Sequence, residues 1–182
     1  MANYNVNDKN TREYQENLYQ GSRYNLLVVL IFTVVNLVML LTGSGSYWLF
    51  SASIPYYLTA FGMMFDALPS SLEPVIGTFT ITALVIAVAI LVVYLLCWIL
   101  SKKRSGWLIA ALVLFAVDTL GMLAMMFISG SSIAEWIMDI VFHAWVLISL
   151  SRGLAAASKL KNMPETVEMP IPPQYTGSDL DA

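Results

Sequence analysis

The chain contains VIGTFTITALVIAVAILVVYLLCWIL (residues 75–100), then SKKRSG, then WLIAALVLFAVDTLGMLAMMFIS (residues 107–129). Each apolar stretch exceeds the roughly 20 residues that a helix needs to cross a bilayer. The basic segment between them is too short to form a domain of its own. These residues therefore predict two neighbouring membrane-spanning helices joined by a tight turn.

Two further apolar stretches flank this pair, at residues 24–42 and 133–150. The last is less hydrophobic because it contains ionisable side chains. The first has an apolar core longer than that of a signal peptide and follows some 20 mostly polar residues, so we expect it to remain as an anchor. The sequence thus predicts an all-α fold, a bundle of four transmembrane helices within residues 23–150.

The composition agrees with a membrane protein. Hydrophobic residues make up 58% of the chain and charged residues 12%, whereas soluble domains carry about 25% charged residues. The small net charge of −3 averages over two different environments and says nothing about nucleic acid, but no basic stripe suited to nucleic-acid binding runs through the sequence. A single cysteine, Cys97, excludes an internal disulfide, a CxxC redox centre and a cysteine-based zinc site. No cofactor is predicted.

Lysine and arginine are confined to three regions: the N-terminal segment, the turn after residue 100 and the C-terminal segment. Positive charge marks the cytoplasmic side of a membrane protein. Four spans place these three regions on one side, so the sequence predicts a multi-pass plasma-membrane protein with both termini cytoplasmic. Residues 1–22 would be a polar tail, and residues 151–182 a tail that is helical to about residue 161 and then disordered. The nine basic residues are Lys9, Arg12, Arg23, Lys102, Lys103, Arg104, Arg152, Lys159 and Lys161.

The predicted outer loop, residues 43–74, is the longest connection. Ser53 is a candidate N-cap with Pro55 just after it, so residues 55–68 are predicted to form a short helix. With about 14 residues this helix is too short to span the membrane. We expect it to lie in the outer interface or to dip partly into the membrane. It can serve as a hydrophobic lid, or as a gate or docking surface.

Four ionisable residues fall within the predicted spans, where such groups usually face a partner or a cavity. They are Asp118, Glu135, Asp139 and His143. The last three follow an i, i+4, i+8 spacing, which places them near one face of a helix. At 1.5 Å per residue, Asp118 lies ~16 Å and His143 ~15 Å from the outer ends of their spans. The sequence therefore predicts that Asp118 and His143 meet near mid-membrane.

Two interpretations of this pair remain open. In the first, Asp118 and His143 form a polar clamp that holds two helices together, and Gly121 lets the helices approach closely. In the second, they form a titrating pair in a proton or cation path, with Asp139 and Glu135 as outer relay sites. A buried acid and a histidine can share one proton near neutral pH.

Two weaker patterns complete the candidate residues. Thioethers at i, i+3, i+4 spacing beside Asp118 suggest a Cu(I) site, although methionine is also ordinary core material. Small residues on the span at 75–100 suit helix packing, within the bundle or between copies of the chain. The methionines are Met122, Met125 and Met126, and the packing residues are Thr78, Thr82, Ala83 and Ala87.

Segments LFSASIPYYLTAFGMMFD (residues 49–66) and MDIVFHAWVLISLSRGLAAASKLK (residues 138–161) resemble small four-span membrane proteins of Gram-positive bacteria. The resemblance implies a bacterial plasma membrane and no particular activity. Enzyme motifs such as HExxH, GxSxG and the P-loop are missing. We therefore expect a non-enzymatic accessory, regulatory or scaffold subunit, in contact with the bilayer and with a membrane-protein partner or further copies of itself. The alternative is a proton- or cation-coupled transporter using Asp118, Asp139 and His143.

Overall fold

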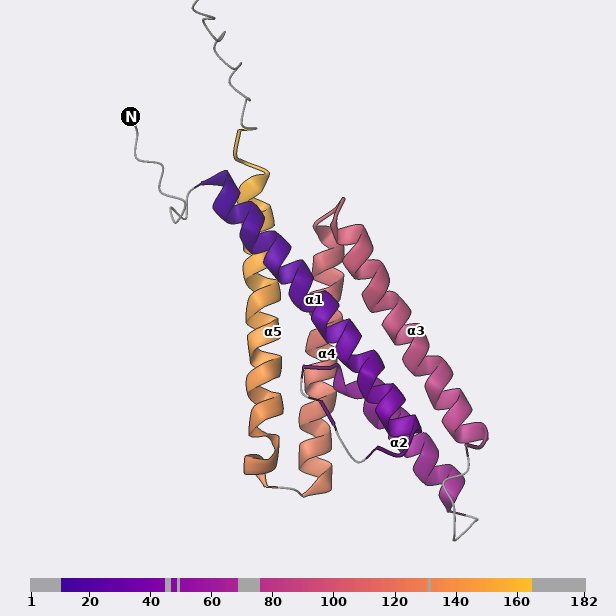
Figure 1. The fold of residues 1–182 in the computed structure, drawn as a ribbon. Helices are drawn as coiled ribbons and strands as arrows, with labels where there is room; N and C mark the ends of the chain where they lie inside the picture. The colour runs from indigo at the N-terminus through magenta and orange to yellow at the C-terminus, as the bar shows by residue number, and fades with distance from the viewer. Residues whose placement is uncertain (1–10, 45–46, 49, 69–75, 131, 165–182) are drawn as a thin grey trace, which may run out of the picture.

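The computed structural model describes residues 11–44, 47–48, 50–68, 76–130 and 132–164. These residues form an all-α fold of five helices (Figure 1): α1 (Arg12–Leu41), α2 (Ser53–Ala67), α3 (Thr78–Ser101), α4 (Gly106–Ser129) and α5 (Ile133–Leu160). All but α2 are long and apolar enough to cross a membrane. On this ground of length and composition the chain is a multi-pass membrane protein. The predicted disordered tail falls mostly outside the described residues.

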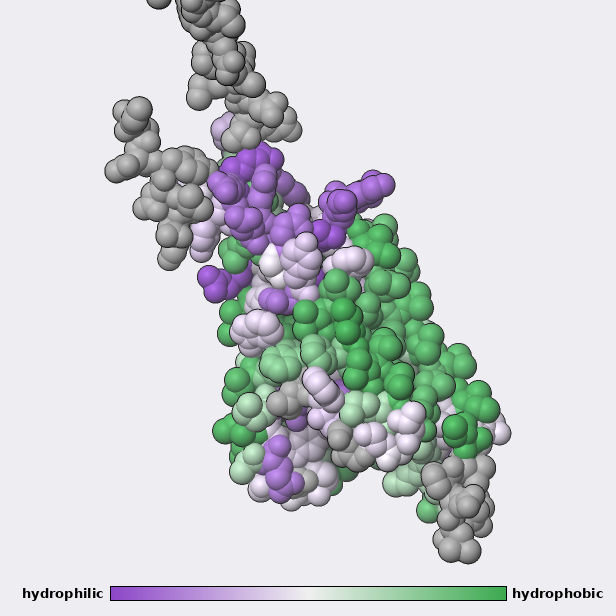
Figure 2. Space-filling model, in the orientation of Figure 1, coloured by the Kyte–Doolittle hydropathy of each residue, from purple (hydrophilic) through white to green (hydrophobic). Residues whose placement is uncertain are grey.

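The four long helices form a bundle in which α1 runs diagonally in front of α4, between α5 and α3 (Figure 1). The start of α1 and the end of α5 lie at the same end of the bundle. The described lysines and arginines lie toward this end, which appears hydrophilic above an apolar body in Figure 2. We call it the basic end and the other the distal end. The long apolar side chains that remain exposed on the body, such as Val85 at 64% and Phe127 at 78%, face outward where lipid would lie.

Helix α1 is longer than the predicted span. It begins at Arg12, with Thr11 as the N-cap that accepts a hydrogen bond from the Tyr14 N–H. Residues 12–22, which the sequence assigned to a tail, therefore continue the first span as one helix. Ser22 is buried against α5, where its hydroxyl donates to the Ser149 carbonyl over 2.6 Å. A Cβ at Gly153 would collide with the Ser22 side chain, so this glycine permits the close α1–α5 contact.

Helix α2 is embedded among the other helices and packs chiefly on α3. It begins at Ser53, two residues before the predicted start, and Ser53 is only 1% exposed. At Gly62, an added Cβ would lie 2.9 Å from both the Phe79 carbonyl oxygen and the Thr80 Cα. Two backbones thus meet here with no room for a side chain. The short helix, which the sequence placed in the outer interface or dipping partly into the membrane, therefore starts in the interior of the bundle.

Asp66, near the end of α2, caps the first turn of α3. Its carboxylate accepts from the backbone N–H groups of Gly77 (3.0 Å), Phe79 (3.2 Å) and Thr80 (2.7 Å), and from the Thr80 hydroxyl (2.6 Å). Negative charge at a helix N-terminus is stabilised by the unpaired N–H groups and the helix dipole. Burial acts to raise the pKa of Asp66, but these hydrogen bonds outweigh it and hold the pKa below its ordinary value of 3.8.

This lowered pKa predicts a pH-dependent contribution to stability. Because the folded-state pKa lies below the unfolded-state value, the Asp66 carboxylate stabilises the fold above that value, and the stabilisation is lost as pH falls through the folded-state pKa. We expect Asp66→Asn to lower Tm near neutral pH and the difference from wild type to shrink as the pH drops below 3.8. Unfolding scans in detergent across this range measure it. A difference that stays constant into strong acid would contradict the assignment.

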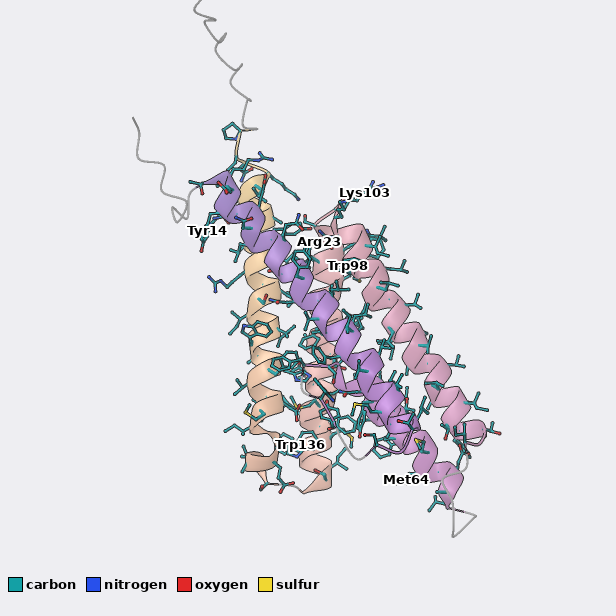
Figure 3. All side chains as sticks on the ribbon, viewed as in Figure 1. Tyr14, Arg23, Met64, Trp98, Lys103 and Trp136 are labelled. Atoms are coloured by element: carbon teal, nitrogen blue, oxygen red, sulfur yellow. The ribbon has the colours of Figure 1, made fainter. Side chains whose placement is uncertain are left out.

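The other end of α3 is capped from α1. Arg23, only 8% exposed, donates to the Ser101 hydroxyl over 2.9 Å and to the Trp98 carbonyl over 3.1 Å. Its guanidinium also lies 6.0 Å from the centre of the Trp98 ring, and the two residues appear together near the basic end in Figure 3. Tyr19 donates to the Ser101 carbonyl over 2.5 Å. A cation at the C-terminus of a helix complements its dipole, so α3 carries a suitable charge at each end.

Candidate functional site

Asp118 lies in the middle of α4 and caps the N-terminus of α2. Its Oδ2 accepts the Ser53 N–H over 2.9 Å and its Oδ1 accepts the Ile54 N–H over 2.7 Å. The residue is 2% exposed. The next residue, Pro55, has no N–H, so Asp118 takes the first two donors that the helix presents. The side chain of Asp118 thus supplies two hydrogen-bond acceptors to a helix terminus that lies inside the bundle.

His143 of α5 faces the same carboxylate, as the sequence predicted. Its Nε2 lies 3.2 Å from Asp118 Oδ2 and 3.4 Å from the Ser53 hydroxyl, and its Nδ1 lies 2.8 Å from the Asp139 carbonyl oxygen. A carbonyl only accepts, so Nδ1 carries a hydrogen and donates it. A second proton must then lie between Nε2 and Oδ2 for that contact to be a hydrogen bond. The pair therefore holds a salt bridge or its proton-transferred neutral form.

The segment that leads into α2 is held inside the bundle by polar side chains of α1. The Asn36 amide donates to the Trp48 carbonyl over 2.7 Å and accepts the Trp48 N–H over 2.9 Å. It also donates to the Ser51 hydroxyl over 2.8 Å, and the Thr33 hydroxyl accepts the Ala52 N–H over 2.8 Å. Thr33 and Asn36 are fully buried. The chain thus enters the bundle from the distal end, turns at the Asp118–His143 pair, and returns toward that end as α2.

Aromatic packing supports this turn. Phe50 adopts a positive φ of 76°, which is uncommon for a residue with a bulky side chain. Its ring contacts Phe142 edge-to-face at 4.6 Å between centroids. The His143 ring stacks on Phe115 at 5.0 Å with 20° between the planes. The buried pair is therefore held from α4 and α5 by rings, which fix the histidine in the orientation that its two nitrogen contacts require.

A pocket of about 320 Å³ opens at the distal end, between α2 and α5. Three tyrosines, a tryptophan and two carboxylates line it, and we call it the aromatic pocket. Asp139 is partly buried and Glu135 is exposed, while the Asp139 carbonyl is the group that orients His143. Asp139 and Glu135, the two residues predicted as outer relay sites, therefore line this pocket. Its lining residues are Tyr47, Tyr56, Tyr57, Glu135, Trp136 and Asp139.

On the other side of the pair, the bundle is filled by apolar side chains. Leu26, Val29, Leu108, Val146 and Leu150 are each at most 1% exposed and belong to one hydrophobic cluster. Among the described residues of this cluster, the Tyr94 hydroxyl is buried and has no hydrogen-bond partner. It lies within electrostatic reach of Asp118. A relay toward the basic end would therefore need waters or a rearrangement of this cluster.

The remaining predicted residues are placed as follows. A Cβ on Gly121 would meet the Ile54 side chain at 2.9 Å, so this glycine makes room for α2 and not for α5. The small residues of α3 divide: Ala83 and Ala87 are buried, while Thr78 and Thr82 are exposed. The Thr82 hydroxyl donates to the Thr78 carbonyl of the same helix over 2.8 Å. Packing through α3 thus uses the alanines.

Metal binding finds limited support in the geometry. Met122 and Met126 are buried in the bundle and Met125 is partly buried. No group of three or more His, Cys, Asp or Glu suited to a metal ion occurs among the described residues. The copper site suggested by the methionine spacing therefore stays a prediction.

The fold and the site define a class: a multi-pass α-helical membrane protein whose short second helix starts inside the bundle on a buried Asp–His pair. Comparison of the chain with protein-family models, curated proteins and solved structures finds no match. The resemblance to four-span proteins of Gram-positive bacteria thus stays a prediction. Sequence analysis did not predict that Asp118 caps α2 or that Asp66 caps α3. The Asp66 cap had a sequence signal, because an acidic residue shortly before a predicted span is a candidate cap for that helix.

Proposed function

We propose that this protein is a non-enzymatic accessory, regulatory or scaffold subunit of a plasma membrane. The observation that carries the proposal is the use of Asp118. Its two oxygens are engaged by the Ser53 and Ile54 N–H groups and by His143. The buried Asp118–His143 pair therefore holds an embedded helix in place, which is the task of a clamp. The apolar cluster beneath the pair supports this reading because it offers no polar continuation among its buried side chains other than Tyr94.

A proton- or cation-coupled transporter is the second candidate. The observation in its favour is the aromatic pocket, which brings Asp139 and Glu135 to an opening above the buried pair. Short helices that end inside a bundle also occur at the substrate sites of transporters. In this protein, however, the buried helix terminus is already occupied by the chain's own carboxylate.

Proton flux separates the two candidates. We expect proteoliposomes with a trapped pH dye to dissipate a pH gradient no faster than protein-free vesicles, with Asp139→Asn indistinguishable from wild type. Flux in the wild-type protein that Asp139→Asn abolishes would establish the transporter instead.

The orientation of the chain in the same vesicles can be measured with a cysteine introduced at Lys103, which is labelled by a membrane-impermeant thiol reagent only when it faces the outside.

The subunit role has a positive test of its own within the native membrane. A photoreactive side chain at Val85, which is 64% exposed on α3, should cross-link to a second polypeptide, or to another copy of the chain. The matched control is Ala87, which is fully buried two residues away. Equal cross-linking from both positions would reflect unfolding and would argue against a partner at this face.

The orientation that we propose has both termini in the cytoplasm. It is supported by the described lysines and arginines, which lie near the start of α1, in the turn between α3 and α4, and in the last part of α5, at the end that appears hydrophilic in Figure 2. The positive-inside rule assigns that end to the cytoplasm. The aromatic pocket then opens toward the outer face of the membrane.

A further inference from the structure

We propose that the aromatic pocket binds a quaternary or alkylated ammonium group, as carried by choline or by a choline lipid. This inference concerns a ligand and goes beyond the subunit role. It holds whether the protein is an accessory subunit or a transporter. Its basis is the combination of ring geometry, charge and volume at one site.

The rings of the pocket form a continuous wall. Tyr47 and Tyr56 contact edge-to-face at 4.9 Å between centroids, and Tyr56 and Tyr57 do so at 5.6 Å. Tyr57 lies 6.0 Å from the ring of Trp136, at 38° between the planes. The first two contacts turn successive rings by 68° and 82°, so the wall presents both faces and edges. An ammonium group within about 6 Å of a ring face is attracted by its quadrupole, most strongly for tryptophan.

Among the described residues, the pocket is lined by two acidic side chains and by no lysine, arginine or histidine. Asp139 and Glu135 both line it. The described lysines and arginines lie toward the opposite end of the bundle. The Nε2 of His143, which lies beside the pocket through its Nδ1 contact with the Asp139 carbonyl, is directed at Asp118 and not at the pocket acids. Glu135 accepts a hydrogen bond from the Ser132 hydroxyl over 3.0 Å. A cation would complete this arrangement.

The size of the pocket and its chemistry narrow the class of cation. About 320 Å³ lies at the lower end of the range for small-molecule sites, which suits a compact head group. A hard metal ion such as Ca²⁺ needs about six to eight oxygen ligands. The two carboxylates of the pocket offer such an ion at most four oxygens, while the four aromatic rings suit a weakly hydrated, methylated ammonium. The site lies near the start of α5, at the distal end of the bundle (Trp136 in Figure 3), where soluble amines and lipid head groups can both reach it.

Titration of the purified protein in maltoside detergent tests the proposal. Choline is compared with 3,3-dimethylbutanol, which has the same shape without the charge, by calorimetry or tryptophan fluorescence. We expect choline or a short-chain phosphatidylcholine to bind, and the neutral alcohol to bind at least about ten-fold more weakly. Tighter binding of choline would identify a soluble ligand, and tighter binding of the phosphatidylcholine a lipid. Equal affinity for choline and the alcohol, or binding of neither ammonium compound, would overturn the proposal.

Substitutions then assign the binding to this pocket. We expect Tyr57→Leu and Asp139→Asn each to weaken ammonium binding by about five- to ten-fold, and Tyr57→Phe to retain it within about two-fold because the ring remains. Glu16→Gln, an exposed acid near the basic end, is the matched control for charge and should bind as wild type. If Asp139→Asn fails to fold, the exposed Glu135→Gln replaces it. Wild-type affinity in all pocket variants would place the ligand elsewhere and refute the assignment.

Discussion

Replacing Asp118 by leucine is expected to cost about 3–5 kcal/mol of unfolding free energy, which is the range for breaking a buried charged pair. The substitution leaves the Ser53 and Ile54 N–H groups without an acceptor and His143 without its partner. Each buried donor that loses its partner costs about 1–3 kcal/mol. Reversible unfolding in mixed detergent micelles measures the loss. Glu135→Gln, at an exposed position, should stay within about 0.5 kcal/mol of wild type.

The double variant with His143→Leu distinguishes a simple ion pair from a cap. If the two residues only compensated one another, the double variant would recover most of the stability. We expect instead that His143→Leu alone costs about 1–3 kcal/mol and that the double variant stays close to Asp118→Leu, because the two N–H groups of α2 remain unpaired. An Asp118→Leu protein as stable as wild type would show that the acid is kept for function, and would favour the transporter.

A side chain at Gly62 is expected to have the second-largest effect. A Cβ there would lie 2.9 Å from the Phe79 carbonyl oxygen and from the Thr80 Cα. Both atoms belong to the backbone of α3 and cannot rotate away. We therefore expect Gly62→Ala to cost about 1–3 kcal/mol, as overpacking does, and Gly62→Val to cost more. The measurement is again unfolding in mixed micelles.

The control for Gly62 is the helical glycine in α1. Gly21 has no atom near the position of an added Cβ. Gly21→Ala should therefore be neutral or stabilise the protein by up to about 1 kcal/mol, through the helix propensity of alanine. The same gain at Gly62 would mean that α2 does not pack on α3 as described. Both substitutions replace a helical glycine by alanine, so helix propensity changes equally in the two variants. A loss of stability at Gly62 beside a gain at Gly21 would therefore report packing.

The long helices were predictable because hydrophobicity over about 20 residues is a local property of the chain. The span predicted at residues 107–129 differs from α4 (Gly106–Ser129) by one residue. Asp118 and His143 could be paired from sequence because a short connection forces α4 and α5 to be antiparallel and the helical rise then sets their depths. The separate N-terminal tail was predicted because polar residues precede the first span. In the structure one of those residues, Ser22, is buried against α5, while others such as Glu16 remain exposed on the same helix.

Tertiary structure alone decided where α2 lies and what the charged residues do. Residues 53–67 are apolar, and that pattern suits an interface as well as an interior. The start of α2 can lie inside the bundle because Asp118 accepts hydrogen bonds from its first N–H groups. Asp66 does the same for the first turn of α3. Composition and the lengths of the apolar stretches therefore indicated a multi-pass membrane protein with four candidate spans. The first N–H groups of α2 need hydrogen-bond acceptors, and inside the bundle water does not supply them. The acceptor therefore comes from a distant part of the chain, Asp118 of α4, which only the tertiary structure reveals.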